Sequence, residues 1–207
     1  AYSSLQSGIA SLDRIYELLD SEDQAEEKPE ARESYRLQGK IDFRDVSFSY
    51  VPERKLIEHM NLVVEPGQMV AIVGGTGAGK TTLVRIIAGL ENADRGTVSG
   101  AGVVSFDFQE DRLINDISAA DNIMLVLDKN DFGGYDKKTM RKIINENLAE
   151  VLKDYPSDKS TGTYSGGMKR RVCLVRAMMK KSDTVILDEP FSGMDEETKI
   201  LAAEYIK

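Results

Sequence analysis

The chain has 207 residues, a formal net charge of −8, and a composition that is 41% hydrophobic and 30% charged. This balance is ordinary for a water-soluble protein with one sizeable core, and the acidic charge argues against a nucleic-acid-binding surface, which needs a basic face. The sequence has no run of about 18 apolar residues, which a membrane-spanning helix would need. Its first residues lack the pattern of a signal peptide. The single cysteine, Cys173, excludes an internal disulfide and favours a reducing compartment.

The first 40 residues are predicted to lie outside the folded domain. In residues 1–20, apolar side chains recur at the spacing of one helix face, which predicts an amphipathic helix packed either on its own domain or on a partner outside the chain. Residues 21–40 are mostly polar and acidic and include Pro29, which indicates a linker. Residues 41–207 are expected to fold. The apolar residues of the helix face are Leu5, Ile9, Leu12, Tyr16 and Leu19.

From Ile41 onward, patterns typical of strands and helices alternate. Residues 41–50 alternate apolar and polar side chains and indicate a strand, and residues 61–75 hold two strands around a Pro66-Gly67 turn. The second of these, Met69–Val73, is a short apolar run of the kind found in buried strands. The alternation predicts an α/β fold with a largely parallel central sheet. The other expected elements are strands at 102–108 and 184–187, and helices at 80–90, over most of 116–155 with a break at Gly133-Gly134, along the stripe Met168, Val172, Val175 and Met179, and at 196–206.

A glycine-rich segment follows the expected strand Met69–Val73. Residues 74–81, GGTGAGKT, fit the phosphate-binding pattern G-x-x-x-x-G-K-[ST] between a strand and a helix. Glycines let successive backbone N–H groups turn toward an anion, and the helix N-terminus adds a favourable dipole. Lys80 is expected to reach the β- and γ-phosphates of a nucleotide, and the Thr81 hydroxyl to ligate Mg²⁺. The dinucleotide pattern G-x-G-x-x-G is not met, which argues against a nicotinamide cofactor.

Two adjacent carboxylates follow the predicted strand 184–187. Asp188, at the strand's C-terminal end, is suited to the Mg²⁺ shell. Glu189 points elsewhere and is expected to polarise a water molecule for in-line attack on the γ-phosphate. An Asp-Glu pair alone is more often a solvated strand end, but the phosphate-binding loop upstream favours the functional interpretation.

Residues 163–171, TYSGGMKRR, resemble the signature motif of ABC ATPases, whose usual form is Leu-Ser-Gly-Gly-Gln. Met168 replaces the usual glutamine and Tyr164 the usual leucine, but neither change removes the Ser-Gly-Gly backbone donors. Further segments match the family in the same order along the chain. Residues 192–195, SGMD, look like the D-loop, Gln109 like the Q-loop glutamine and Tyr50 like the A-loop aromatic residue.

The resemblance implies a P-loop NTPase fold with a RecA-like core of mostly parallel strands, an antiparallel β subdomain and a small α-helical subdomain. It implies ATP and Mg²⁺ as cofactors and ATP hydrolysis as the activity. The implied catalytic residues are Glu189, Gln109 and Lys80. The implied nucleotide-binding residues are Tyr50, Gly75, Thr76, Gly77, Ala78, Gly79, Lys80, Thr81, Thr82, Ser165, Gly166 and Gly167. The implied metal ligands are Thr81, Gln109 and Asp188.

In the family, Tyr50 would stack on adenine, and the signature segment from Ser165 to Gly167 would bind the γ-phosphate of ATP held by the opposite subunit. Two ATP molecules are then enclosed in a head-to-tail dimer, and Asp195 would communicate across the interface. The implied partner is therefore a second ABC ATPase domain.

The N-terminal helix and acidic linker look like the junction between the membrane and ATPase domains of an exporter-type half-transporter. The resemblance implies a transmembrane domain upstream of Ala1 and a location at the cytoplasmic face of a membrane, and the acidic charge argues against a nucleic-acid partner. An importer ATPase subunit and a non-hydrolysing regulatory cassette of a heterodimeric transporter are the alternatives, although the intact Glu189 argues against the second. The family's switch histidine is expected beyond Lys207, because the only histidine, His59, lies upstream of the P-loop.

Three other features are interpreted as structural. The basic run Lys169, Arg170 and Arg171 is expected to form a solvated helix face, and Cys173 to be a small buried apolar residue. Residues 131–133, DFG, match a kinase triplet, but no other kinase motif accompanies them, so they indicate a turn.

Overall fold

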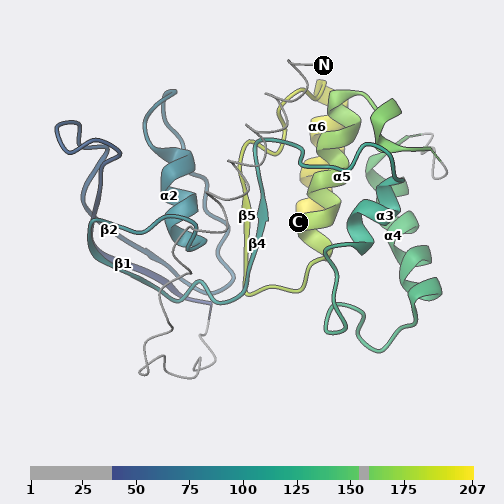
Figure 1. The fold of residues 1–207 in the computed structure, drawn as a ribbon, viewed down its shortest axis with the longest axis horizontal. Coiled ribbons are helices and arrows are strands. Elements are labelled where there is room, and N and C mark those ends of the chain that lie inside the picture. Colours follow the sequence, from purple (N-terminus) through teal and green to yellow (C-terminus); the bar gives the residue numbers. More distant parts are fainter. Residues whose placement is uncertain (1–38, 154–158) are drawn as a thin grey trace, which may run out of the picture. The chain divides into compact units, whose positions relative to one another are not determined.

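The computed structural model describes residues 39–153 and 159–207 (Figure 1). The predicted helix at 1–20 and nearly all of the predicted linker at 21–40 lie outside the described residues. No helix within the described ranges has the length and apolar character needed to cross a membrane.

An antiparallel sheet of three strands forms the first part of the described fold. Its order is β2-β1-β3, with β1 (Ile41–Phe48) between β2 (Ile57–Val64) and β3 (Arg95–Ser99). Helix α2 (Lys80–Ile87) covers the apolar face of this sheet. The predicted strand at 41–50 and helix at 80–90 are thus confirmed, whereas β3 was not predicted from its short, mostly exposed sequence RGTVS.

A bulge keeps the apolar residues of β1 on one face. Phe43 and Val46 are both buried although they are three residues apart, a spacing that would place them on opposite faces of a regular strand. The pairing register shifts between them, and Asp45 has a φ of 53°. The extra residue returns Val46 to the side that packs against Leu83 and Ile86 of α2.

A parallel pair of strands forms the second part. β4 (Val104–Asp107) and β5 (Thr184–Leu187) pair in the register Val104↔Thr184 to Asp107↔Leu187. Helix α5 (Gly166–Met179) contacts both strands, and α6 (Glu196–Ile206) packs on α5 through Leu174, Met194 and Ala202. The carboxyl ends of β4 and β5 therefore lie side by side, and both strands pack against α5.

The helical part has its own core. Helices α3 (Ala119–Met124) and α4 (Lys137–Val151) pack against α5, and a short 3-10 helix, η1 (Thr161–Thr163), precedes α5. Ser118 and Asp136 cap the two helices by accepting backbone N–H groups, which explains where each begins. The predicted break at Gly133-Gly134 is confirmed as a turn that also contains residues 131–133. The buried residues of this core are Ala119, Ala120, Ile123, Met140, Ile144, Leu148, Val151, Leu152, Tyr164, Val172 and Val175.

The prediction of a buried strand at Met69–Val73 is wrong. The segment joins no strand ladder in the described part of the chain, and the residues Met69 and Val73 are 76% and 87% exposed. A parallel strand is held by backbone hydrogen bonds to its neighbours, and the two parallel strands described here, β4 and β5, pair only with each other. Without a ladder partner, apolar composition does not place the segment in a sheet.

Candidate functional site

The loop before α2 has the geometry of an anion cradle. Gly77 and Gly79 have φ values of 80° and 85°, a region that glycine reaches without strain. Gly79 is the N-cap of α2 and supplies no side-chain cap, so the first N–H groups of the helix face outward. The ammonium of Lys80 donates hydrogen bonds to the carbonyl oxygens of Gly74 and Gly75, both at 2.9 Å. The Lys80 side chain therefore points back toward the start of its own loop.

Tyr50 lies beside this helix. Its hydroxyl is 3.1 Å from Oγ1 of Thr82, which is buried on the first turn of α2. The ring meets Phe48 edge-on, with centroids 4.8 Å apart, yet Tyr50 remains 58% exposed. Thr82 is therefore packed inside the fold, whereas Tyr50 beside it is largely exposed.

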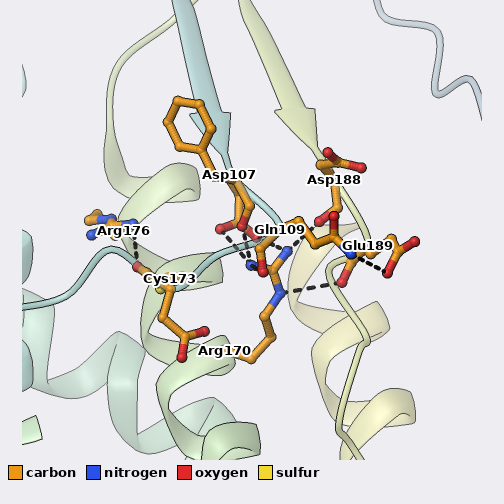
Figure 2. A network of polar contacts seen from close by, with 9 residues as sticks. Asp107, Gln109, Arg170, Cys173, Arg176, Asp188 and Glu189 are labelled. Carbon is orange, nitrogen blue, oxygen red and sulfur yellow. Dashed lines mark hydrogen bonds and ion pairs between the residues drawn. The ribbon is translucent and has the colours of Figure 1, made fainter. Parts of the chain in front are cut away.

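The second group of site residues gathers where β4 and β5 end (Figure 2). Asp188 directly follows β5, and its N–H donates to the carbonyl of Asp107 at 2.9 Å, so the ladder continues one residue past the strand. Glu189 has a φ of 53°, uncommon for a residue with a side chain. Nε2 of Gln109 lies 3.4 Å from Oε2 of Glu189. The structure therefore brings Gln109 and Glu189 together although they are 80 residues apart.

Arg170 is the functional candidate that the sequence interpretation missed. It was expected on a solvated face, but only 3% of its side chain is exposed, and it pairs with the fully buried Asp107, whose Oδ2 lies 3.1 Å from Nη2. That contact is not aligned as a hydrogen bond, and Oδ2 has no other partner in the described residues. Burial raises the pKa of the Asp107 carboxyl to about 6, although the charge of Arg170 lowers it. The sequence signal was Asp107 itself, a charged residue inside a predicted strand.

The same helix carries two further residues that bind the segment after β4. Arg176 donates to the carbonyl oxygens of Arg112 and Asp111, at 2.9 and 3.1 Å. The thiol of Cys173 donates to the carbonyl of Asp111 at 2.8 Å, and burial raises its pKa to about 12. Cys173 is therefore buried, as expected, and holds no reactive thiolate.

The signature segment forms the start of α5. Ser165 is the N-cap, and its hydroxyl accepts the N–H of Met168 at 3.2 Å. Gly166 and Gly167 belong to the first helical turn rather than preceding it, so their N–H groups are among the free donors of a helix N-terminus. A Cβ on Gly167 would lie 2.9 Å from the carbonyl oxygen of Gly193, which places the signature segment against the D-loop-like segment 192–195.

The site residues thus form separate groups within the chain. In the described ranges, no hydrogen bond or ion pair connects the cradle at residues 74–82 with the group at Gln109, Asp188 and Glu189. Asp195, at the other end of the segment 192–195, caps α6 by accepting the N–H of Thr198 at 2.8 Å.

Comparison with known proteins identifies the fold and the family. The model of the ABC transporter family matches residues 57–192. The fatty acid ABC transporter ATP-binding/permease protein of Mycobacterium bovis is 32% identical over 223 residues, covering 97% of this chain and 34% of the relative. An aliphatic sulfonates import ATP-binding protein of Rhodococcus jostii is 34% identical over 158 residues, covering 73% of this chain and 60% of the relative.

Among solved structures, a bacterial Atm1-family ABC exporter with ATP bound matches with a TM-score of 0.75 and 22% identity, covering 99% of this chain and 39% of that one. The chain spans about a third of the length of the ATP-binding/permease protein of Mycobacterium bovis. The likeness confirms the predicted fold class, a P-loop NTPase fold with an antiparallel β part and a helical part. The ordered motifs and the family match over about two thirds of the residues show that the chain belongs to the ABC transporter family.

Proposed function

We propose that the chain binds ATP with Mg²⁺, hydrolyses ATP, and so powers transport by a larger membrane protein. The observation that carries hydrolysis is the meeting of Gln109 and Glu189 at 3.4 Å, beside Asp188 and at the ends of two parallel strands. An amide and a carboxylate at this edge are suited to orient one water molecule between them.

The phosphates of ATP fit the loop before α2. A Cβ at Gly75 or Gly77 would meet no atom within 4 Å, so this part of the loop is open. The uncapped N-terminus of α2 supplies N–H donors and a favourable dipole. Lys80 would exchange the carbonyl oxygens of Gly74 and Gly75 for β- and γ-phosphate oxygens, which bind an ammonium more strongly because they are charged. We assign Thr76, Ala78 and Gly79 of the loop, and Thr81 and Thr82 on the first turn of α2, to the same nucleotide site.

Thr81, Gln109 and Asp188 are the proposed Mg²⁺ ligands. Within residues 39–153 and 159–207, no three His, Cys, Asp or Glu side chains are placed to hold a metal by themselves. A donor set of one carboxylate, one hydroxyl and one amide fits Mg²⁺, which usually takes one or two carboxylates and completes its shell with water and substrate phosphates. Held by these residues, Mg²⁺ would supply positive charge that offsets the charge developing on the transferring phosphoryl group.

Glu189 is proposed as the general base. Its positive φ turns the residue away from the direction of β5, so Asp188 and Glu189 do not compete for one ligand. Gln109, which now donates to the Glu189 carboxylate, would also contact the attacking water or the metal. In that arrangement the carboxylate accepts a proton from water as the water oxygen attacks the γ-phosphorus, and ADP leaves in line.

The Glu189→Gln substitution tests the hydrolysis proposal. The amide keeps the size of the side chain but accepts no proton, so turnover by the full-length protein should fall by about 10²–10⁴-fold. ATP–Mg²⁺ affinity should remain, whereas Lys80→Ala should abolish it because the phosphate-binding ammonium is gone. Unchanged turnover in Glu189→Gln contradicts the general-base assignment, and wild-type affinity in Lys80→Ala contradicts the cradle.

The proposed transport direction is export. The relative that carries both ATP-binding and permease functions aligns with 97% of this chain, whereas the importer ATP-binding relative aligns with 73%. We therefore propose that residues 1–20 extend from a membrane domain, that residues 21–40 link it to the ATPase domain at 41–207, and that this domain lies at the cytoplasmic face. An importer subunit is the alternative, and it would require the membrane domain to be a separate chain.

A second ATPase domain is the proposed partner. Ser165 and Gly166 are exposed at the N-terminus of α5, where the helix offers free N–H donors to an anion outside this chain. The γ-phosphate of ATP on a partner subunit would occupy that position. If the protein instead works as a regulatory cassette in a heterodimer, it will close on ATP without turning it over.

A further inference from the structure

A buried ion pair lies behind the proposed hydrolysis site. Arg170 of α5 and Asp107 at the end of β4 are 3% and 0% exposed, and their closest nitrogen–oxygen distance is 3.1 Å. Two buried charges gain little stability for a fold, because losing their hydration offsets most of their attraction. A structural role alone therefore gives a weak account of why this arginine points inward.

The guanidinium of Arg170 joins the backbones on both sides of the site (Figure 2). Nη1 donates to the carbonyl oxygens of Phe108 and, at 3.5 Å, of Gln109. Nη2 donates to the carbonyl of Asp188, and Nε to that of Glu189 at 3.3 Å. One planar group thus contacts the backbone carbonyls of residues 108, 109, 188 and 189.

These contacts fix the residues proposed to act on water. Gln109 and Glu189 lie on exposed loops after their strands, and Glu189 holds an uncommon φ. Their side chains meet only if the two backbones keep one separation, and the rigid fork of an arginine is suited to set it. Asp107, the last residue of β4, supplies the negative charge that balances the buried guanidinium of Arg170.

We propose that Arg170 is a positioning residue for ATP hydrolysis, which holds the backbones of Gln109 and Glu189 so that their side chains face one water molecule. This inference rests on the proposed function. Arg170 also belongs to the helix that the signature residue Ser165 caps, so a displacement of α5 on closure with a partner would reach both loops through Arg170, and the segment after β4 through Cys173 and Arg176 as well.

A paired substitution separates positioning from simple stabilisation. Arg170→Gln alone leaves Asp107 buried without its counter-charge, so it is expected to destabilise the full-length protein. Adding Asp107→Asn removes that charge while keeping the shape of the side chain, so the double variant should recover most of the lost thermal stability. The double variant still lacks the hydrogen bonds from the guanidinium to the backbone carbonyls of residues 108, 109, 188 and 189.

The expected result for the double variant is ATP affinity equal to wild type but turnover at least about tenfold lower, because positioning affects the chemical step and not the cradle. Turnover that recovers together with stability would overturn the proposal. Arg176→Gln is the matched control, an arginine on the same helix that binds carbonyls beyond the site, and its turnover should stay within about twofold of wild type.

Hydrogen exchange gives a readout that does not depend on turnover. The amides of Asp188 and Ser192 donate to the carbonyls of Asp107 and Glu189, at 2.9 and 3.1 Å. In the double variant, peptides covering these amides should exchange at least about tenfold faster, while peptides from α2 stay unchanged. Unchanged exchange at Asp188 and Ser192 contradicts the positioning role. A wild-type protein that binds ATP without turnover contradicts the proposed function, which is a separate outcome.

Discussion

At the scale of single residues, the most unusual side chain is Asp107, a carboxylate that is fully buried at a strand end. Its pKa is raised to about 6 from 3.8, mainly by burial, while Arg170 and Arg176 lower it and Asp111 and Asp188 raise it further. The folded protein therefore holds a proton on Asp107 that the unfolded chain releases in the window between these two values. In this window, stability contributed by that proton is lost as the pH rises.

The Asp107→Asn variant measures the pH-dependent contribution of this carboxyl to stability, because the variant has no carboxyl to titrate at position 107. Between pH of about 5 and 6.5, as the pH rises through the pKa of the folded protein, the free energy of unfolding of the wild type should fall relative to the variant by on the order of 1 kcal/mol. Urea unfolding at several pH values above the sequence pI of about 4.9 measures the difference. Parallel pH profiles for the two proteins would show that the pKa of Asp107 is not raised.

At the scale of elements, the start of α5 is held against the segment that precedes α6. The tight approach of Gly167 to the carbonyl oxygen of Gly193 leaves no room for a side chain, whereas a Cβ on Gly166, one residue earlier, would meet nothing within 4 Å. Two neighbouring glycines in one helical turn therefore serve different purposes.

Alanine substitutions should change stability in opposite directions at these two positions. Gly167→Ala forces the backbone of 192–195 or the α5 N-terminus to move and should cost about 1–3 kcal/mol. Gly166→Ala adds a better helix former in open space and should be neutral or stabilising by up to about 1 kcal/mol. Denaturant unfolding of both variants checks the pair, and equal effects would contradict the packing of Gly167 on Gly193.

The elements with local signals were predictable from the sequence, and those that depend on distant partners were not. Helices α2 and α6 begin where a glycine cap or an aspartate cap stands in the sequence, and β1 was found by its apolar pattern despite the bulge at Asp45. The run Met69–Val73 has the composition of a strand, but a ladder needs a neighbour that composition does not reveal.

The same distinction holds for the candidate site. The glycine loop, Asp188 and Glu189 were proposed from short motifs, and Gln109 from its place after a predicted strand in the order of motifs of the family. Arg170 was placed on the surface because a run of consecutive basic residues in a helix is usually solvated. Its burial follows from a partner 63 residues away, Asp107, so only the packing of α5 against β4 reveals it.

At the scale of the whole molecule, the proposed function assigns two parts of an ATP site to different segments of the chain. The cradle at residues 74–82 is suited to the phosphates of one nucleotide, and the exposed N-terminus of α5 is suited to a terminal phosphate of another. Two copies arranged head to tail would complete two sites, each from the cradle of one chain and the signature segment of the other. ATP then favours the closed pair because the trans contacts exist only there.

Glu189→Gln should reveal this closed pair, because it retains ATP binding and removes the step that reopens the dimer. In light scattering, the mass of the variant should double when ATP–Mg²⁺ is added and return when the nucleotide is removed. Combining Glu189→Gln with Lys80→Ala should keep the protein monomeric, since the cradle no longer holds the shared nucleotide. A monomer that has ATP bound would mean that the signature segment, with Met168 in place of glutamine, does not act in trans by itself, and that closure requires the membrane domain or a different partner subunit.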